Sequence, residues 1–461
     1  MYSVNLSCGG QIMRFLSLFL VLFLFIPTNS FAGEASVEKL KGKCMTCHKK
    51  ESPGLYRQWA ESTHAKRNVT CFSCHEAKKG EPDAFEHEGM LIATLVTPID
   101  CGKCHEKEQD QVAKSHHAKA GKILASLDNY LAGVSAGSPV VIAGCEHCHG
   151  NKVEIDPNSP NKLALKSWPN SGIGRINPDG SSGACNACHS RHLFSKAQAR
   201  APENCGKCHL GPDHPQKEIY EESKHGIAYR ANEDTMNLDK DNWVVGEDYY
   251  AAPTCATCHM SATNKQEITH DVGERLSWNL RAPVSKPQKD SEAKREKMQD
   301  VCAACHGKRF TDGFYRQLDG VVNLYDQKFA APAKEIVGIL KKNGSMKNKA
   351  KFTNDVEWIY WELWHHEGRR ARHGASMGGP DYTWWHGMYE VVKHFYMKFI
   401  PAVRKLEDKE ANAYIDNLLQ SDWHKWFNEE AKKTQENLKS GATEKMYEGL
   451  FTPPWERQTK K

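Results

Sequence analysis

Eight short segments of the chain share the pattern Cys-x-x-Cys-His, and together they use 16 of its 17 cysteines. Disulfides do not require a histidine after every second cysteine. Zinc sites use Cys-x-x-Cys pairs two at a time or with a later histidine pair. Covalent c-type haem does need this spacing, because two thioether bonds are followed by the proximal iron ligand. We therefore expect eight c-type haems, numbered with their motifs in chain order.

The eight motifs supply two sets of expected haem contacts. The thioether cysteines are Cys44, Cys47, Cys71, Cys74, Cys101, Cys104, Cys145, Cys148, Cys185, Cys188, Cys205, Cys208, Cys255, Cys258, Cys302 and Cys305. The proximal iron ligands are His48, His75, His105, His149, His189, His209, His259 and His306.

Eight haems would reduce the apolar core that the side chains have to supply. Apolar residues make up only 39% of the 461 residues and the mean hydropathy is −0.66, so ordinary helices would share a thin core. Large, flat, apolar macrocycles would replace much of that core. We predict a mainly α multihaem cytochrome c with little β-structure, many loops and a long-helix C-terminal part. The net charge of +5 is modest and indicates no nucleic-acid partner.

The N-terminus is typical of a secretory signal peptide, predicted over residues 1–32. Arg14 precedes the apolar run Phe15–Ile26, and Ser30-Phe31-Ala32 is a small-x-small cleavage site. Met13 is an alternative start, and a retained N-terminal anchor is the competing interpretation. With either start residue, Cys8 is absent from the mature chain. No later stretch has 18 consecutive apolar residues, so we expect an exported chain, periplasmic or equivalent, whose mature form has no membrane span.

The spacing of the motifs divides the remaining chain into three predicted regions. Residues 33–140 carry three motifs and residues 141–320 carry five, the latter as the catalytic core. Residues 151–184, rich in Asn, Pro, Gly and Ser, predict a long ordered loop or lid. Residues 321–461 carry no motif and have aromatic-rich helical patterns, which we expect to mediate oligomerisation.

Electron-transfer haems usually have a second axial ligand, whereas catalytic haems keep one position open. Besides the eight proximal ligands 15 histidines remain, some of them in plausible ligand settings, although a surplus residue such as His424 is expected at the surface. His116 and His117 are adjacent, and only one of them can serve one iron. The seven expected distal ligands are His64, His87, His117, His192, His225, His270 and His386. Seven distal ligands would leave one of eight haems open.

The segment Cys208–Gly226 holds two histidines beyond its motif. Pro215 and Gly226 predict a helix over residues 215–225, with His214 at its start and His225 at its end. The two would lie about 16 Å apart along the axis, too far to serve one iron. His225 is therefore an expected axial ligand. His214, beside Asp213 at the positive helix end, is a candidate proton shuttle, with a capping or ligand role as the alternative.

Two segments, Gly174–Gly226 and Trp364–Gly387, resemble the hydroxylamine oxidoreductase family of octahaem cytochromes c. The pattern H-P-Q-x-E-x-Y from His214 onward also resembles the related pentahaem nitrite reductases. The resemblance implies that haem 4, on Cys145 and Cys148, is catalytic, with Asp213 and His214 in its distal pocket. It also implies a homotrimer and electron relay through the other haems.

In oxidative members of this family a tyrosine from a neighbouring subunit is covalently bonded to the catalytic haem, and reductive members lack the link. Tyr382 is the first candidate for that cross-link, because it lies in a Gly-Pro-rich turn that can reach across an interface. Tyr389 and Tyr396 are alternatives. All three could instead be residues that pack between helices. The resemblance therefore implies an oxidoreductase interconverting small nitrogen compounds: hydroxylamine oxidation, or nitrite or hydroxylamine reduction. Its expected electron partner is a cytochrome or quinone-linked protein. The competing interpretations are a non-catalytic electron conduit and a reductase of sulfur oxyanions such as tetrathionate.

Overall fold

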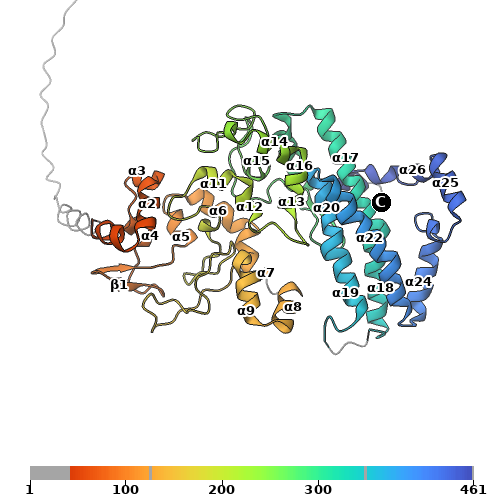
Figure 1. Ribbon diagram of the computed structural model, residues 1–461, viewed down its shortest axis with the longest axis horizontal. Coiled ribbons are helices and arrows are strands. Elements are labelled where there is room, and N and C mark those ends of the chain that lie inside the picture. Colours follow the sequence, from red (N-terminus) through yellow and green to blue (C-terminus); the bar gives the residue numbers. More distant parts are fainter. Residues whose placement is uncertain (1–41, 124–126, 347–349, 459–461) are drawn as a thin grey trace, which may run out of the picture.

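The computed structural model describes residues 42–123, 127–346 and 350–458 (Figure 1). Helices dominate this part of the chain, and its only ladders are two short antiparallel pairs. β1 (Phe85–His87) pairs with β2 (Met90–Ile92), and β3 (Trp278–Asn279) pairs with β4 (Lys286–Pro287). The prediction of a mainly α fold with little β-structure is confirmed. The predicted signal peptide lies outside the described residues, among which no helix is long and apolar enough to cross a membrane.

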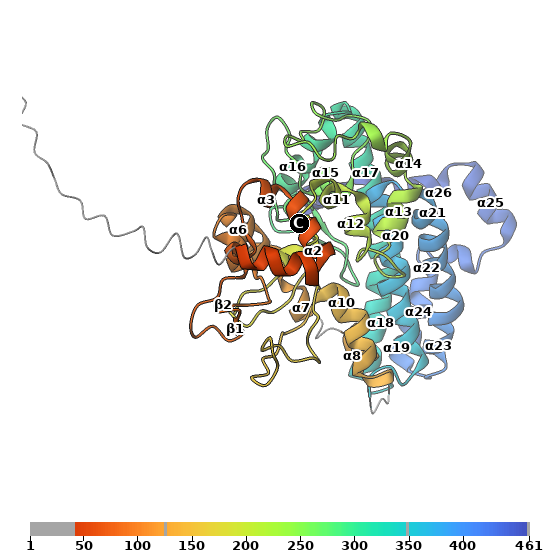
Figure 2. The same cartoon turned by 60° about the vertical axis from the view of Figure 1, so that its left-hand side comes forward.

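Between residues 42 and 307 most helices are short and separated by loops, as Figures 1 and 2 show. Several motifs are themselves one helical turn, and Thr70 and Thr254 cap two of them through hydrogen bonds to the third residue of the turn. The helices are α2 (Pro53–Glu61), α3 (Thr63–Lys66), α4 (Cys71–His75), α5 (Pro98–Gly102), α6 (Glu106–Lys114), α7 (Ala120–Ile123), α8 (Leu127–Ser135), α9 (Ser138–Val140), α10 (Glu146–His149), α11 (Lys196–Arg200), α12 (Pro202–Gly206), α13 (Gln216–Glu222), α14 (Lys224–Ala231), α15 (Cys255–His259) and α16 (Ser291–Ala303).

The predicted long loop follows motif 4 and contains no helix. Its centre is fixed by Arg175, which is 1% exposed and donates hydrogen bonds to Asn177, to the carbonyl of Asn170 and to the carbonyl of Val96. Gly172 packs directly on Gly150, where an added Cβ would lie 2.0 Å from the Gly150 nitrogen. The loop is therefore an ordered element that covers the end of motif 4.

The C-terminal part consists of long helices that pack side by side (Figure 1). Its first helix begins at Lys308, so the predicted boundary at residue 320 falls inside it. π-helical turns interrupt several of these helices without breaking them. The elements are α17 (Lys308–Leu324), η5 (Tyr325–Ala330), α18 (Ala331–Lys342), α19 (Asp355–Trp361), η6 (Glu362–Glu367), α20 (Gly368–Met377), α21 (Pro380–Thr383), η7 (Trp384–Met388), α22 (Tyr389–His394), η8 (Phe395–Phe399), α23 (Ile400–Arg404), α24 (Lys409–Gln420), α25 (Ala431–Lys439), α26 (Ala442–Lys445) and α27 (Pro454–Gln458).

The largest apolar core lies between these long helices. Tyr325, Phe329, Phe395 and Phe399 are each 0–1% exposed, and they pack with buried aliphatic residues of α18, α22, α23 and α24. His424 joins this core at 2% exposure and shares a 2.8 Å hydrogen bond with the Tyr396 hydroxyl. The expectation of a surface position for His424 was wrong, because a buried partner satisfies its ring nitrogen.

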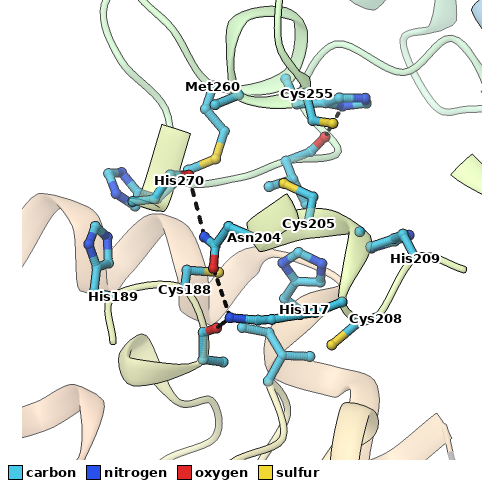
Figure 3. A pocket seen from close by; sticks show the side chains of 18 of the residues that line it. His117, Cys188, His189, Asn204, Cys205, Cys208, His209, Cys255, Met260 and His270 are labelled. Atoms are coloured by element: carbon cyan, nitrogen blue, oxygen red, sulfur yellow. Dashed lines mark hydrogen bonds between the residues drawn. The ribbon is translucent and has the colours of Figure 1, made fainter. Parts of the chain in front are cut away.

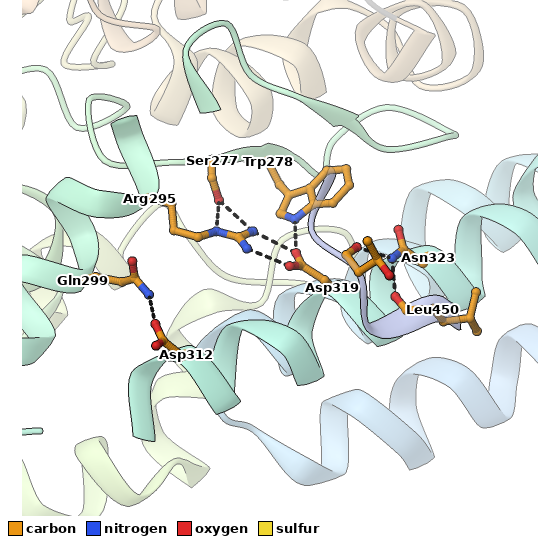
Figure 4. A network of polar contacts seen from close by, with 9 residues as sticks. Ser277, Trp278, Arg295, Gln299, Asp312, Asp319, Asn323 and Leu450 are labelled. Atoms are coloured by element: carbon orange, nitrogen blue, oxygen red, sulfur yellow. Dashed lines mark hydrogen bonds and ion pairs between the residues drawn. The ribbon is translucent and has the colours of Figure 1, made fainter. Parts of the chain in front are cut away.

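A buried polar network joins the haem-bearing part to the first long helix (Figure 4). Arg295 of α16 makes two hydrogen bonds, of 2.7 and 2.8 Å, to the Asp319 carboxylate of α17. Trp278 donates to the same carboxylate at 2.9 Å, and Arg295 also reaches the Ser277 hydroxyl. Asp319 is 0% exposed, so its charge depends on these partners. The network fixes the strand pair β3–β4 against α17.

Candidate functional site

One continuous cavity of about 3420 Å³ runs through the haem-bearing part and is lined by cysteines and histidines of all eight motifs. Pockets for ordinary small ligands measure about 300–1,000 Å³. The cavity is therefore large enough for several large flat groups, and its motif-derived lining fits covalently attached haem.

The spacing of the histidine rings tests whether the residues fit haem iron. Two imidazoles on opposite sides of one metal, with bonds of about 2 Å, place their ring centroids about 6 Å apart. Five motif histidines each face a second histidine at 6.1–6.4 Å across the cavity. The pairs are His48–His87 (6.3 Å), His105–His64 (6.3 Å), His75–His192 (6.4 Å), His189–His270 (6.4 Å) and His306–His225 (6.1 Å).

Motif 6 has two histidines at this spacing. The ring of His209 lies 6.1 Å from that of His117 and 6.0 Å from that of His214. Figure 3 shows His117 close to His209, with Cys205 and Cys208 nearby. His116 is exposed whereas His117 is partly buried among these groups, and burial lowers the pKa of His117 to about 4. The geometry therefore favours His117 over His116 as the ligand.

The structure does not bring His386 to a motif histidine. Its ring stacks on Tyr382 at 5.3 Å, its Nδ1 contacts the Asp381 carboxylate, and its side chain is 58% exposed. Within the described chain this position is a surface site beside Tyr382, not a wall of the cavity.

The predicted helix over residues 215–225 was wrong, because the chain forms two helices that meet at Ser223. Ser223 has extended backbone angles and its hydroxyl accepts a hydrogen bond from the Gly226 amide, which starts α14. His225 therefore lies in the first turn of α14, not at the C-terminal end of a helix. Gly226 is needed inside the corner, since a Cβ there would lie 1.9 Å from the Tyr220 carbonyl oxygen.

Asp213 and His214 lie together on the cavity wall, between motif 6 and α13. His214 Nδ1 is 2.6 Å from one Asp213 carboxylate oxygen, and Arg369 approaches the other oxygen at 3.2 Å. Burial raises the pKa of Asp213, but the hydrogen bond to His214 and the charges of His365 and Arg369 outweigh it and hold the pKa well below its usual range. The carboxylate thus stays ionised and orients the imidazole ring.

Three residues beside this pair were missed by the sequence analysis: His365, Arg369 and His373. Arg369 donates towards His365 Nε2 at 3.0 Å, and His365 itself is 3% exposed and stacks on Trp361 at 3.9 Å. Burial lowers the pKa of His373 to about 3, with further lowering from Arg372, Arg369 and His214. The sequence signal was their four-residue spacing, which places all three on one side of a helix.

Thiols of different motifs also meet in the cavity. Cys148 of motif 4 contacts Cys208 of motif 6, Cys101 contacts Cys185, and Cys205 contacts Cys255. The groups anchored at these positions would therefore have their attachment edges side by side, including those of motifs 4 and 6. Motif 4 is thereby placed next to the segment that carries Asp213 and His214.

The chain is similar to known multihaem proteins. The family described as "Seven times multi-haem cytochrome CxxCH" matches residues 179–354. A "Probable nitrite reductase-hydroxylamine oxidoreductase fusion protein" of Kuenenia stuttgartiensis is 24% identical over 80% of this chain. That alignment covers 52% of the relative, so the chain spans about half the length of the curated relative it matches.

Two solved structures share the fold. A "Hypothetical multiheme protein" is 25% identical with a TM-score of 0.70, over 84% of this chain and 100% of the other. A chain of a reducing HAO-like protein complex of Kuenenia stuttgartiensis is 21% identical with a TM-score of 0.59, over 83% of this chain and 88% of the other. The fold, the motifs and the paired histidines together define a multihaem c-type cytochrome. Within that class the chain is similar to hydroxylamine oxidoreductase-like multihaem proteins.

Proposed function

We propose that the chain is an exported octahaem oxidoreductase that converts a small nitrogen compound at one open haem, carried by Cys145, Cys148 and His149. The observation that supports this most directly is the Asp213–His214 pair, held by Arg369 on the wall of the haem cavity. The haem supplies iron coordination and electron transfer when bound. The protein supplies the protons, the charge and the other axial ligands.

His214 moves the protons in this proposal. The Asp213 carboxylate binds Nδ1 and fixes the ring, which leaves Nε2 as the atom that exchanges a proton with the substrate. Each N–O bond broken in reduction consumes protons, and hydroxylamine oxidation releases them, so the same pair suits either direction. Arg369 places positive charge beside the pair, which favours an anion such as nitrite, and we favour reduction for that reason.

The proposal includes a homotrimer and an external redox partner, a cytochrome or quinone-linked protein. An exposed aromatic cluster next to Tyr382 supports an interface on this face: Trp384, Trp385 and Tyr389 are 46%, 58% and 41% exposed and contact one another. Denaturing electrophoresis of the reduced protein tests the cross-link, because a haem–Tyr382 bond would leave a trimer-sized band that Tyr382→Phe abolishes. A monomer band from the native protein assigns the reductive form.

A pair of substitutions tests the catalytic assignment. His214→Ala is expected to reduce turnover of nitrite and hydroxylamine by about 10²–10⁴-fold while all low-spin haem signals remain. His117→Ala is the matched variant, and it should convert one haem from low-spin to high-spin. Haem content by mass spectrometry and spin state by electron paramagnetic resonance check both variants.

The opposite pattern would contradict the assignment. Loss of a low-spin signal in His214→Ala would make His214 the axial ligand opposite His209. A native protein with every haem low-spin, and without activity on nitrite or hydroxylamine, would instead identify a non-catalytic conduit. Activity confined to tetrathionate would identify the sulfur-oxyanion alternative.

A further inference from the structure

The C-terminal helices contain a cluster of ionisable side chains that does not line the haem cavity. Glu362 and Glu367 come from η6, and His394 ends the neighbouring helix α22. One ligand atom from each of the three lies within 4.8 Å of the other two. The cluster is separate from the Asp213–His214 pair and does not depend on the proposed reaction.

The π-helical turn explains how two residues of one segment reach the same point. In an α-helix residues five apart point about 140° away from each other, because each residue turns by about 100°. A π-helix bonds residue i to residue i+5, which brings such a pair back to nearly the same side. Glu362 and Glu367 are five apart, so η6 turns both carboxylates towards α22. Side-by-side packing of the two segments brings His394 to meet them.

Burial makes this arrangement costly without a further partner. Glu367 and His394 are 3% and 7% exposed, and His394 Nδ1 contacts one oxygen of the Glu367 carboxylate. The second oxygen, Oε2, is buried and makes no hydrogen bond. A buried carboxylate oxygen without a partner carries a desolvation cost. A cation bound to this oxygen would offset that cost.

We propose that Glu362, Glu367 and His394 bind one divalent transition-metal ion. One imidazole nitrogen and two carboxylates form the mixed nitrogen–oxygen ligand set that suits Zn²⁺ or Mn²⁺. Glu390 lies on the other side of the imidazole ring, 3.9 Å from His394 Nε2, and supports the ring from outside the metal shell. The ion offsets the negative charge of the carboxylates, and it fastens η6 to α22.

The position of the site gives the ion a structural consequence. His365 lies within η6, on the same turn as Glu367, and reaches the Asp213–Arg369 pair. A π-helical turn persists only where its surroundings hold it. A metal bound at Glu367 therefore fixes the turn that positions His365 at the cavity wall.

Metal retention by the holoprotein tests the site. The native protein is stripped with a chelator, then dialysed separately against Zn²⁺ alone and Mn²⁺ alone, and metal per chain is measured by plasma mass spectrometry against haem iron. We expect one equivalent of at least one of these metals to be retained. Glu367→Gln and Glu362→Gln should each weaken its binding about tenfold or more.

Two comparisons keep the outcome decisive. His386→Gln removes an exposed histidine from the adjacent turn and should leave retention unchanged, which excludes surface binding. Glu362→Gln is the milder variant because Glu362 is less buried than Glu367, and an unaltered haem spectrum shows that it folds. Retention of neither metal by the native protein, or equal retention by both glutamate variants, would overturn the proposal and leave a buried Glu367–His394 ion pair.

Discussion

The haem-bearing part and the C-terminal helices of this protein are stabilised by different means. The long helices share a continuous core of buried aromatic and aliphatic side chains, including Phe329, Phe395 and Phe399. Between residues 42 and 200 the described buried cluster contains only Leu95, Val153 and Leu163. A large cavity lined by the motifs occupies the place of a side-chain core. A second buried cluster, around Tyr229, Trp243 and Tyr249, lies in the later section of the haem-bearing part. We therefore predict that residues 42–200 depend on their cofactors to fold and that the C-terminal helices do not.

The largest expected effect comes from removing the anchors of one central haem. Replacing Cys205 and Cys208 with serine should leave the haem-bearing part sensitive to protease, because motif 6 neighbours motifs 4 and 7 and its haem would link them. Residues 308–458 should survive as a resistant fragment, which mass spectrometry can identify. Phe399→Ala is the counterpart and should lower the melting temperature with no change in haem content. Equal protease resistance of both parts in the double-serine variant would contradict the comparison.

The junction between the two parts is the next test. Asp319→Ala leaves Arg295 buried without its carboxylate, and we expect a loss of about 3–5 kcal/mol in the free energy of unfolding. Asp312 lies on the same helix with a 39% exposed side chain that pairs with Lys308, so Asp312→Ala should cost no more than about 1 kcal/mol. Thermal unfolding followed by circular dichroism compares the two. Similar shifts in both variants would show that the buried network does not couple the parts.

The buried Lys328 makes the stability of the helical core depend on pH. Burial lowers the pKa of Lys328 to about 8, against about 10.4 in an unfolded chain. Below pH 8 the folded protein carries the full cost of a buried charge, on the order of 3 kcal/mol. Between pH 8 and 10.4 the folded state loses this proton while the unfolded state keeps it, so the contribution to stability rises with pH.

Lys328→Met should therefore be more stable than the native protein at pH 7, by up to about 3 kcal/mol, and the difference should shrink by pH 10. Melting temperatures of both proteins at the two pH values measure it. The 3.0 Å contact of Lys328 with the Tyr447 hydroxyl is lost in the variant. A native protein that is more stable than Lys328→Met at pH 7 would show that this contact outweighs the burial cost.

The smallest effect is expected at His386. Its exposed position predicts that His386→Ala changes the free energy of unfolding by no more than about 0.5 kcal/mol. The number of low-spin haems should also stay unchanged, as electron paramagnetic resonance can show. A lost low-spin haem would mean that the helical part supplies an axial ligand, and it would contradict the division between the two parts.

The sequence predicted local chemistry better than distant contacts. A Cys-x-x-Cys-His motif carries its cysteines and proximal histidine in one turn, so no tertiary information is needed to find them. A distal histidine lies far along the chain from its partner. His192 follows motif 5 by three residues, yet the structure places it opposite His75 of motif 2. Residue spacing could nominate His192 as a ligand but could not tell which motif it faces.

Two errors show where local patterns were misread. Ser223 is a strong helix-capping residue inside the predicted helix, and its capping signal was available in the sequence. His424 offered no such signal, because its burial depends on Tyr396 from another helix. The Glu362–Glu367 pair was also hidden, since an α-helical reading puts these carboxylates on different sides. Irregular turns and buried polar partners are features that only the folded chain defines.

The contacts between cysteines of different motifs have a consequence for haem attachment. Cys101 with Cys185, Cys148 with Cys208 and Cys205 with Cys255 would lie in contact in a folded chain that had not received its haems. In an oxidising compartment such neighbours are prone to join as disulfides, which would block the sulfurs that bond the haem vinyl groups until they are reduced again. We therefore expect haem attachment to take place on an open chain whose thiols are kept reduced, with compaction last. The cofactor would then arrive before the fold is complete.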